Sequence, residues 1–139
     1  MATVRASLSL NSADVLTSAL ALSTVANLTC DSGALIRAKI KGVTHDATAL
    51  RIYAANQCNQ RAYLYVKNLQ SDIEQYIYVY NDSSSNDDLV AKIGGGEFAF
   101  IPVAVDKAYA VYATKPDTMV EYGVFGNDNS DAPFTGAGS

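Results

Sequence analysis

The sequence predicts an all-β protein, a sandwich or barrel of antiparallel strands, and three observations carry that prediction. Apolar and polar residues alternate with a period of two over most of the 139 residues, which is typical of strands that bury one face. Turn residues separate these runs at the spacing of about 8 to 12 residues found in sandwiches and barrels. A helical start signal competes with the strand pattern only in residues 11–27.

The first expected strand covers residues 3–10, where one face carries Val4, Ala6, Leu8 and Leu10. Residues 11–27 are ambiguous. Ser12-Ala13-Asp14 resembles a helix cap, whereas the apolar and β-branched residues that follow favour an extended chain, and we favour a strand. Residues 28–30 and 34–41 are expected to form a hairpin across the turn at 31–33.

Seven further strands are expected toward the C-terminus: 49–54, 61–68, 73–80, 89–93, 97–103, 107–114 and 120–125. Polar segments at 55–60 and 81–88 separate some of them, and Gly94-Gly95-Gly96 is best explained as a hairpin turn. Pro102 near a strand end and Pro116 in a turn are both placements that a sheet tolerates.

The length favours one domain, which we place at residues 1–125, with residues 1–10 as a possible N-terminal arm strand. Composition changes at residues 126–139, which are rich in Gly, Ser, Asn and Asp. We expect a flexible C-terminal tail there, because it has little apolar surface to bury. The alternative is that Pro133 and Phe134 dock on a neighbouring copy.

Composition indicates a protein that associates with others. Apolar residues make up 49% and charged residues 17%, with a mean hydropathy of +0.05. The net charge of −4 argues against a nucleic-acid partner, and no run reaches the roughly 18 apolar residues of a membrane span. The first residues lack the order of a signal peptide, so we expect a reducing cytoplasm, with Cys30 and Cys58 as free buried thiols rather than a disulfide.

No residue pattern predicts an enzyme, a cofactor or a metal site. His45, the single histidine, lies in a loop without an obvious second group. The segment 82–88 offers oxygen ligands but lacks the glycine and glutamate of a calcium loop. Asp72 and Glu74 would share a strand face or a turn, but such a pair occurs by chance in acidic proteins. An enzyme of unrecognised type remains only a third possibility.

Tyrosines at period two give the strongest signal in the chain. We expect one sheet face to carry the five rings of Tyr63, Tyr65, Tyr76, Tyr78 and Tyr80. The opposite face would carry Ala62, Leu64, Val66, Ile77 and Val79. The tyrosine face is either the second packed face of a sandwich sheet or an exposed surface for a protein or a sugar.

Several motifs resemble those of small virion proteins of tailed bacteriophages, especially phages of marine cyanobacteria. They are ATVRASLSL at 2–10, AYLYVKN at 62–68, GGGEFAFIP at 94–102, AVYA at 110–113 and VEYGVF at 120–125. The resemblance covers residues 61–125 and, more loosely, the start of the chain. It implies a β-sandwich, jelly-roll-like structural protein without catalytic residues.

The resemblance also implies a role as a capsid decoration or cement protein, made in the host cytoplasm and bound to the outer surface of the head. Expected partners are the major capsid protein or other virion proteins, and copies of the chain itself. A homo-oligomer is expected and a trimer is favoured, because it would suit a local threefold axis of a shell. Candidate interface residues are the five tyrosines and Phe134. The alternative is a tail or fibre module that binds host surface glycan.

Overall fold

Ten strands form in the computed structural model, which describes residues 2–30, 32–44, 49–82 and 88–128, and no residue in these ranges is helical. In chain order the strands are β1 (Ala2–Ser12), β2 (Leu20–Cys30), β3 (Ser32–Ile40), β4 (Leu50–Tyr53), β5 (Cys58–Asn68), β6 (Ile77–Asn81), β7 (Asp88–Ile93), β8 (Phe98–Val103), β9 (Tyr109–Ala113) and β10 (Thr118–Asp128). Every pairing is antiparallel, so the all-β prediction is confirmed.

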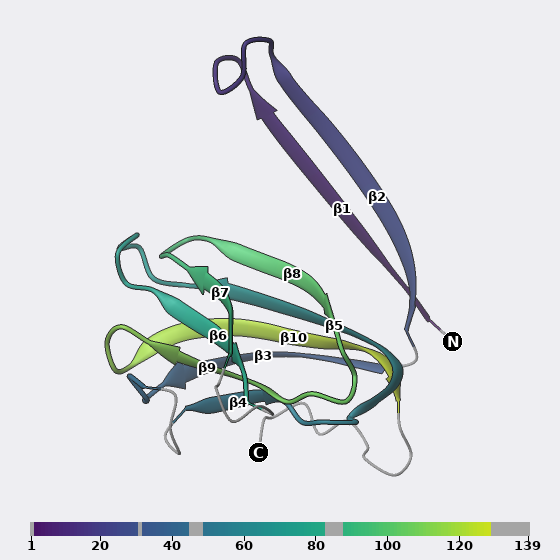
Figure 1. Cartoon of the computed structure of the whole chain (residues 1–139), viewed down its shortest axis with the longest axis vertical. Coiled ribbons are helices and arrows are strands. Elements are labelled where there is room, and N and C mark those ends of the chain that lie inside the picture. Colours follow the sequence, from purple (N-terminus) through teal and green to yellow (C-terminus); the bar gives the residue numbers. More distant parts are fainter. Residues whose placement is uncertain (1, 31, 45–48, 83–87, 129–139) are drawn as a thin grey trace. The chain divides into compact units, whose positions relative to one another are not determined.

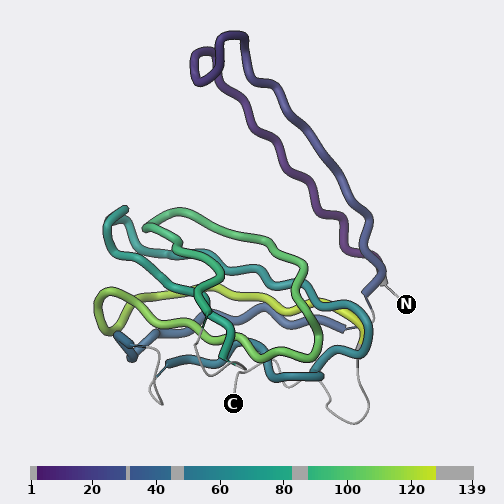
Figure 2. The backbone as a smooth tube through the Cα atoms, viewed as in Figure 1, coloured from purple at the N-terminus to yellow at the C-terminus, as the bar shows by residue number. Residues whose placement is uncertain are grey.

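The chain divides into two units, Met1–Cys30 and Asp31–Ser139. The first is a long hairpin in which β1 and β2 pair along their whole length, from Ala2 opposite Cys30 to Ser12 opposite Leu20, as the tube in Figure 2 shows. The expected strand at 3–10 is confirmed. Residues 20–27 are strand as we favoured, whereas residues 13–18 are a series of bends.

The hairpin is amphipathic. Cross-strand partners lie on the same face, and the register brings apolar residues together on one face and mostly polar residues on the other. Its apolar face, the hairpin face from here on, carries Val4, Ala6, Leu8, Leu10, Leu20, Leu22, Ala26 and Leu28. The opposite face is mostly polar, with Thr3, Arg5, Ser7, Ser9, Asn11, Ser23, Asn27 and Thr29. Arg5 is the only charged residue in the two strands and lies on the polar face, so the hairpin face is uncharged.

The second unit is a sandwich of two four-stranded sheets (Figure 1). Their strand orders are β3-β10-β5-β8 and β4-β9-β6-β7. A single apolar core lies between them, built from inward-facing residues of both sheets, which include Leu64, Val66, Ile77, Val79, Val111, Val120, Tyr122 and Val124. All five residues expected opposite the tyrosines are buried, which confirms that part of the period-two prediction.

Two expectations about connections need correction. Residues 28–30 and 34–41 form no hairpin, because β2 pairs with β1 and β3 pairs with β10. Gly94–Gly96 forms a turn between strands of different sheets, β7 and β8, rather than a hairpin. Turn residues show where a chain can reverse, but the choice of partner strand depends on long-range pairing.

The domain boundaries also differ from those expected. The first 30 residues form a unit of their own, whereas we expected residues 1–125 to form one domain. Strand β10 continues past the expected boundary at residue 126, since Gly126 pairs with Ser32 on one side and Ala62 on the other. Residues 129–139, with Phe134, lie outside the described residues.

Buried polar side chains form hydrogen bonds with the segments that connect the strands of the sandwich. The side-chain amide of Asn68 donates to the carbonyl oxygens of Gln75 (2.6 Å) and Ile93 (3.0 Å), and its oxygen accepts the backbone N–H of Gln70 at 3.0 Å. This residue is fully buried. One side chain therefore ties the end of β5 to the segment before β6 and to the end of β7.

Tyr53 makes a second polar anchor. Its buried hydroxyl donates to the carbonyl oxygen of Val105 at 2.9 Å and accepts the backbone N–H of Cys58 at 3.1 Å. Burial raises the pKa of Tyr53 above its ordinary value, so the hydroxyl stays protonated and can donate. Through these two hydrogen bonds, Tyr53 at the end of β4 joins the segment after β8 to the start of β5.

Candidate interaction surfaces

The outer surface of the β3-β10-β5-β8 sheet carries a cluster of large apolar side chains. We call it the aromatic face, and its residues are Leu35, Tyr63, Tyr65, Phe98, Phe100, Pro102 and Phe125. The register places them in neighbouring rows, because Tyr63 pairs with Phe125 and Pro102 while Tyr65 pairs with Phe100. Leu35 and Phe98 remain 60% and 59% exposed.

The rings of the aromatic face hold each other in place. Tyr63 and Phe100 stack with ring centroids 5.9 Å apart and 6° between their planes. The Phe125 ring lies over Gly33 on the neighbouring strand β3 and over Gly123 on its own strand β10, since a Cβ added at these glycines would come within 2.5 Å and 2.8 Å of it. The aromatic face is therefore pre-formed in the isolated chain.

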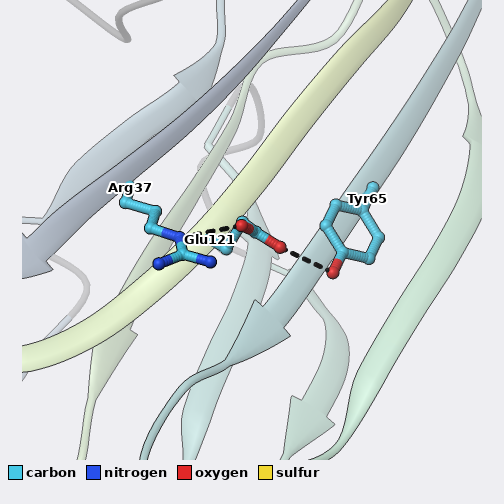
Figure 3. A network of polar contacts seen from close by, with 3 residues as sticks. All are labelled: Arg37, Tyr65 and Glu121. Carbon is cyan, nitrogen blue, oxygen red and sulfur yellow. Dashed lines mark hydrogen bonds and ion pairs between the residues drawn. The ribbon is translucent and has the colours of Figure 1, made fainter.

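Tyr65 of this face also belongs to a polar network with Arg37 and Glu121, which Figure 3 shows. Glu121 on β10 accepts a hydrogen bond from Arg37 on β3 at 2.9 Å and another from the Tyr65 hydroxyl on β5 at 3.0 Å. These two donors hold the pKa of Glu121 below its ordinary value, and burial together with the bond to Glu121 raises the pKa of Tyr65. The network links three strands by side chains.

A second aromatic group, the tyrosine ladder, lies on the outer surface of the other sheet. It consists of Tyr76, Tyr78, Tyr80 and Tyr112. Tyr78 stacks on Tyr112 at 4.9 Å between centroids, Tyr80 meets Tyr112 at 5.6 Å, and the Lys92 ammonium lies 4.1 Å from the centre of the Tyr76 ring. Tyr80 is buried, whereas Tyr76 and Tyr78 are half-buried.

The expectation of five tyrosines on one face is therefore wrong. Tyr63 and Tyr65 belong to one sheet, and Tyr78 and Tyr80 to the other, with Tyr76 just before β6. The physical reason is that residues 69–76 cross from one sheet to the next instead of turning back beside β5. Period two fixes which face a residue occupies on its own strand, but it does not say which sheet the strand joins.

A shallow groove of about 530 Å³ lies where β7 and β8 border the two sheets. Its lining comes from residues 91–93 and 96–99. Lys92 and Glu97 supply opposite charges there, and Phe98 supplies an exposed ring. The groove adjoins both aromatic groups, because Phe98 belongs to the aromatic face and Lys92 covers Tyr76.

The residues weighed for chemistry are not brought together. Asp72 and Glu74 are exposed, and the Asp72 carboxylate accepts the backbone N–H of Glu74 at 3.0 Å. Cys30 and Cys58 are buried thiols that are not joined in a disulfide, as expected. His45 and residues 83–87 lie outside the described part of the chain, and within that part no cluster of acidic, His and Cys side chains could hold a metal ion.

The hairpin face could be predicted only in part from the sequence. The alternation of β1 was visible in the sequence, but its pairing with β2 was not. In the structure Leu8, Leu10 and Leu22 are exposed over 41%, 46% and 43% of their surface. They come from paired positions of the two strands, since Leu10 faces Leu22. The result is an apolar strip that Thr24 interrupts opposite Leu8.

Comparison with protein-family models, with curated proteins and with solved structures found no match to this chain. In the described ranges there is also no helix with the length and apolar character needed to span a bilayer.

Proposed function

We propose that this protein is a structural component of a tailed-phage particle that binds the outer surface of the head and stabilises the shell. The observation that carries the proposal is the exposure of large apolar side chains on two surfaces of a chain whose core is already closed: Leu8, Leu10 and Leu22 on the hairpin face, and Leu35 and Phe98 around the buried Tyr63 on the aromatic face. Soluble monomers rarely leave contiguous apolar patches of this kind exposed, and where they occur they mark contact surfaces. Stabilising other proteins by contact is therefore the activity that the geometry supports best.

The topology of the sandwich supports the same proposal. We infer a jelly roll from the strand order, because β3-β10, β4-β9, β5-β8 and β6-β7 pair as if one long hairpin had been rolled into two sheets. Jelly rolls recur in viral capsid proteins and in lectins. Fold alone does not decide between these roles, so this support is an analogy.

Binding to heads tests the proposal. Phage heads assembled without this protein are incubated with the full chain and sedimented, and the bound amount is measured against the shell subunit. Saturable binding that raises the temperature at which heads release their DNA is expected. Absence of binding to such heads would overturn the proposal.

A matched pair of variants locates the contact. Phe98→Glu places a charge on the exposed aromatic face, and Ile73→Glu places the same charge at a residue of similar exposure outside any strand. Head binding should weaken for Phe98→Glu and stay unchanged for Ile73→Glu. Equal effects would place the contact elsewhere on the molecule.

The alternative, a tail or fibre module that binds host glycan, is favoured by one observation. Tyr76 and Lys92 lie beside the groove that Glu97 and Phe98 also line, which combines ring faces with charged hydrogen-bonding groups. Aromatic stacking with a few polar groups is the usual chemistry of sugar recognition. Titration with host surface polysaccharide tests it: binding that is lost on Tyr76→Ser would favour the alternative over the head protein.

A further inference from the structure

The hairpin needs a partner surface to be stable. A two-stranded hairpin on its own is marginal in water, and further strands or packing against another element are needed to stabilise it. Both strands are 11 residues long, yet the leucines near the turn remain more than two-fifths exposed. The question is which surface covers them.

The area that the hairpin face can bury limits which surface can cover it. Strands of 11 residues are about 37 Å long and a pair is about 10 Å wide, so the hairpin face can bury up to about 400 Å². Two hairpins packed face to face would bury about 800 Å² in total, which is the size of a crystal-packing contact. Two separate contacts per pair of molecules would reach about 1,600 Å², the size of a stable interface.

The aromatic face has the dimensions and chemistry to receive a hairpin. Strands β5 and β10 at its centre are also 11 residues long, and four strands are wide enough for a two-stranded layer. Its exposed Leu35 and Phe98 flank the ordered rings of Tyr63 and Phe100. Sheet-on-sheet packing between an uncharged apolar face and such a surface repeats the arrangement inside the sandwich itself.

We propose that the hairpin face of one copy packs on the aromatic face of a second copy, and that the second copy returns the same contact to form a twofold dimer. A reciprocal dimer uses both faces of each copy, and its two contacts together reach the size of a stable interface. The proposal deepens the proposed function and rests on it in one respect, that these surfaces serve assembly. Because the dimer covers both faces, heads would bind the dimer through its remaining outer surface, and Phe98→Glu would weaken head binding by weakening the dimer. The partner it names is a second copy of this chain.

Mass in solution is the first test. Analytical ultracentrifugation of the full chain should give a dimer at micromolar concentrations. A charge in the receiving surface, Leu35→Glu, should raise the dimer dissociation constant about tenfold or more, because the carboxylate would be buried without a partner. Leu89→Glu is the matched control, since Leu89 is similarly exposed but pairs with Tyr80 on the other sheet. It should leave the constant unchanged.

Cross-linking between different copies tests the geometry. One preparation carries Leu10→Cys in the hairpin and the other carries Leu35→Cys on the aromatic face, and the two are mixed and treated with a short bifunctional maleimide. Cross-links between the two preparations are expected, whereas each preparation alone should give few. Native Cys30 and Cys58 are buried and serve as the unreactive background.

Four results would overturn the dimer. They are a monomer up to about 100 µM, a trimer, an equal effect of Leu35→Glu and Leu89→Glu, or cross-links only between two Leu10→Cys hairpins. Sedimentation of the full chain with heads measures head binding separately, so a chain that binds heads without forming the dimer and a dimer that does not bind heads are distinct outcomes.

Discussion

Tyr63 and Phe100 stack almost in parallel across the β5–β8 pair, with 5.9 Å between ring centroids. They are diagonal neighbours in the register, since Tyr63 faces Pro102 and Tyr65 faces Phe100. Offset stacking of this kind adds about 0.5 to 1.5 kcal/mol beyond the area it buries. The pair fixes the orientation of the aromatic face within the chain itself, so a partner would meet a rigid surface.

Gly126 is predicted to be the least replaceable glycine of the sandwich. A Cβ there would meet the backbone carbonyl oxygen of Arg61 and the Cys58 sulfur at 2.8 Å, on a strand paired on both sides. We expect Gly126→Ala to lower the free energy of unfolding by about 2 to 3 kcal/mol in urea titration. Gly123→Ala should cost less, because the nearest atoms there belong to the Phe125 side chain rather than to the backbone. A smaller loss at Gly126 than at Gly123 would contradict this.

Asn68→Ala should destabilise the sandwich by about 3 kcal/mol. It would leave the carbonyl oxygens of Gln75 and Ile93 and the N–H of Gln70 without their side-chain partner. Asn68→Asp should cost at least as much, since a carboxylate cannot donate to the two carbonyls. Exposed Asn59 on the same strand is the control, and its change to Ala should alter stability by less than about 0.5 kcal/mol. Thermal unfolding of the three variants measures these effects.

Tyr53→Phe removes one hydroxyl from the core and should cost about 2 kcal/mol. The Cys58 N–H and the Val105 carbonyl would each lose a hydrogen bond in a fully buried setting. Half-buried Tyr76 offers the matched change, and Tyr76→Phe is expected to be near neutral. Equal losses of unfolding free energy for the two changes, measured by chemical unfolding, would show that the Tyr53 hydroxyl stabilises the fold no more than the Tyr76 hydroxyl does.

The lowered pKa of Glu121 predicts that the free energy of unfolding depends on pH. Hydrogen bonds from Arg37 and Tyr65 lower its pKa in the folded chain from the ordinary 4.5, so the unfolded chain binds a proton more readily. The stabilisation is present above pH 4.5 and is lost as the pH falls through the lowered folded-state pKa. Unfolding of the wild type and Glu121→Gln, compared from about pH 7 to pH 3, should show a stability difference that shrinks on acidification. A constant difference would exclude this role.

The faces of individual strands could be predicted from the sequence. Alternation placed Leu64, Val66, Ile77 and Val79 in the core, because a strand that buries one face must repeat every two residues. The outward direction of the tyrosines on these strands follows from the same rule. Their division between two sheets does not, since nothing in residues 69–76 states that the chain crosses the sandwich there.

The hairpin was predictable only in its first strand. Val4, Ala6, Leu8 and Leu10 alternate cleanly, whereas β2 places Thr24 on the apolar face and Val25 on the polar face, which blurs its period. The turn residues at 31–33 also favoured a different hairpin, formed by residues 28–30 and 34–41, instead of the observed pairing of β2 with β1. The aromatic face was invisible for a related reason: Leu35, Phe100 and Phe125 come from three strands that meet only through long-range pairing.

The copy number of this protein in purified phage particles tests the central claim most directly. Quantitative mass spectrometry would measure it against the major shell subunit as internal standard. The account predicts a number comparable to that of the shell subunit, as expected for a protein that covers the head. A small fraction of that number would place the chain in the tail or fibres, and its absence from particles would contradict the assignment to the virion.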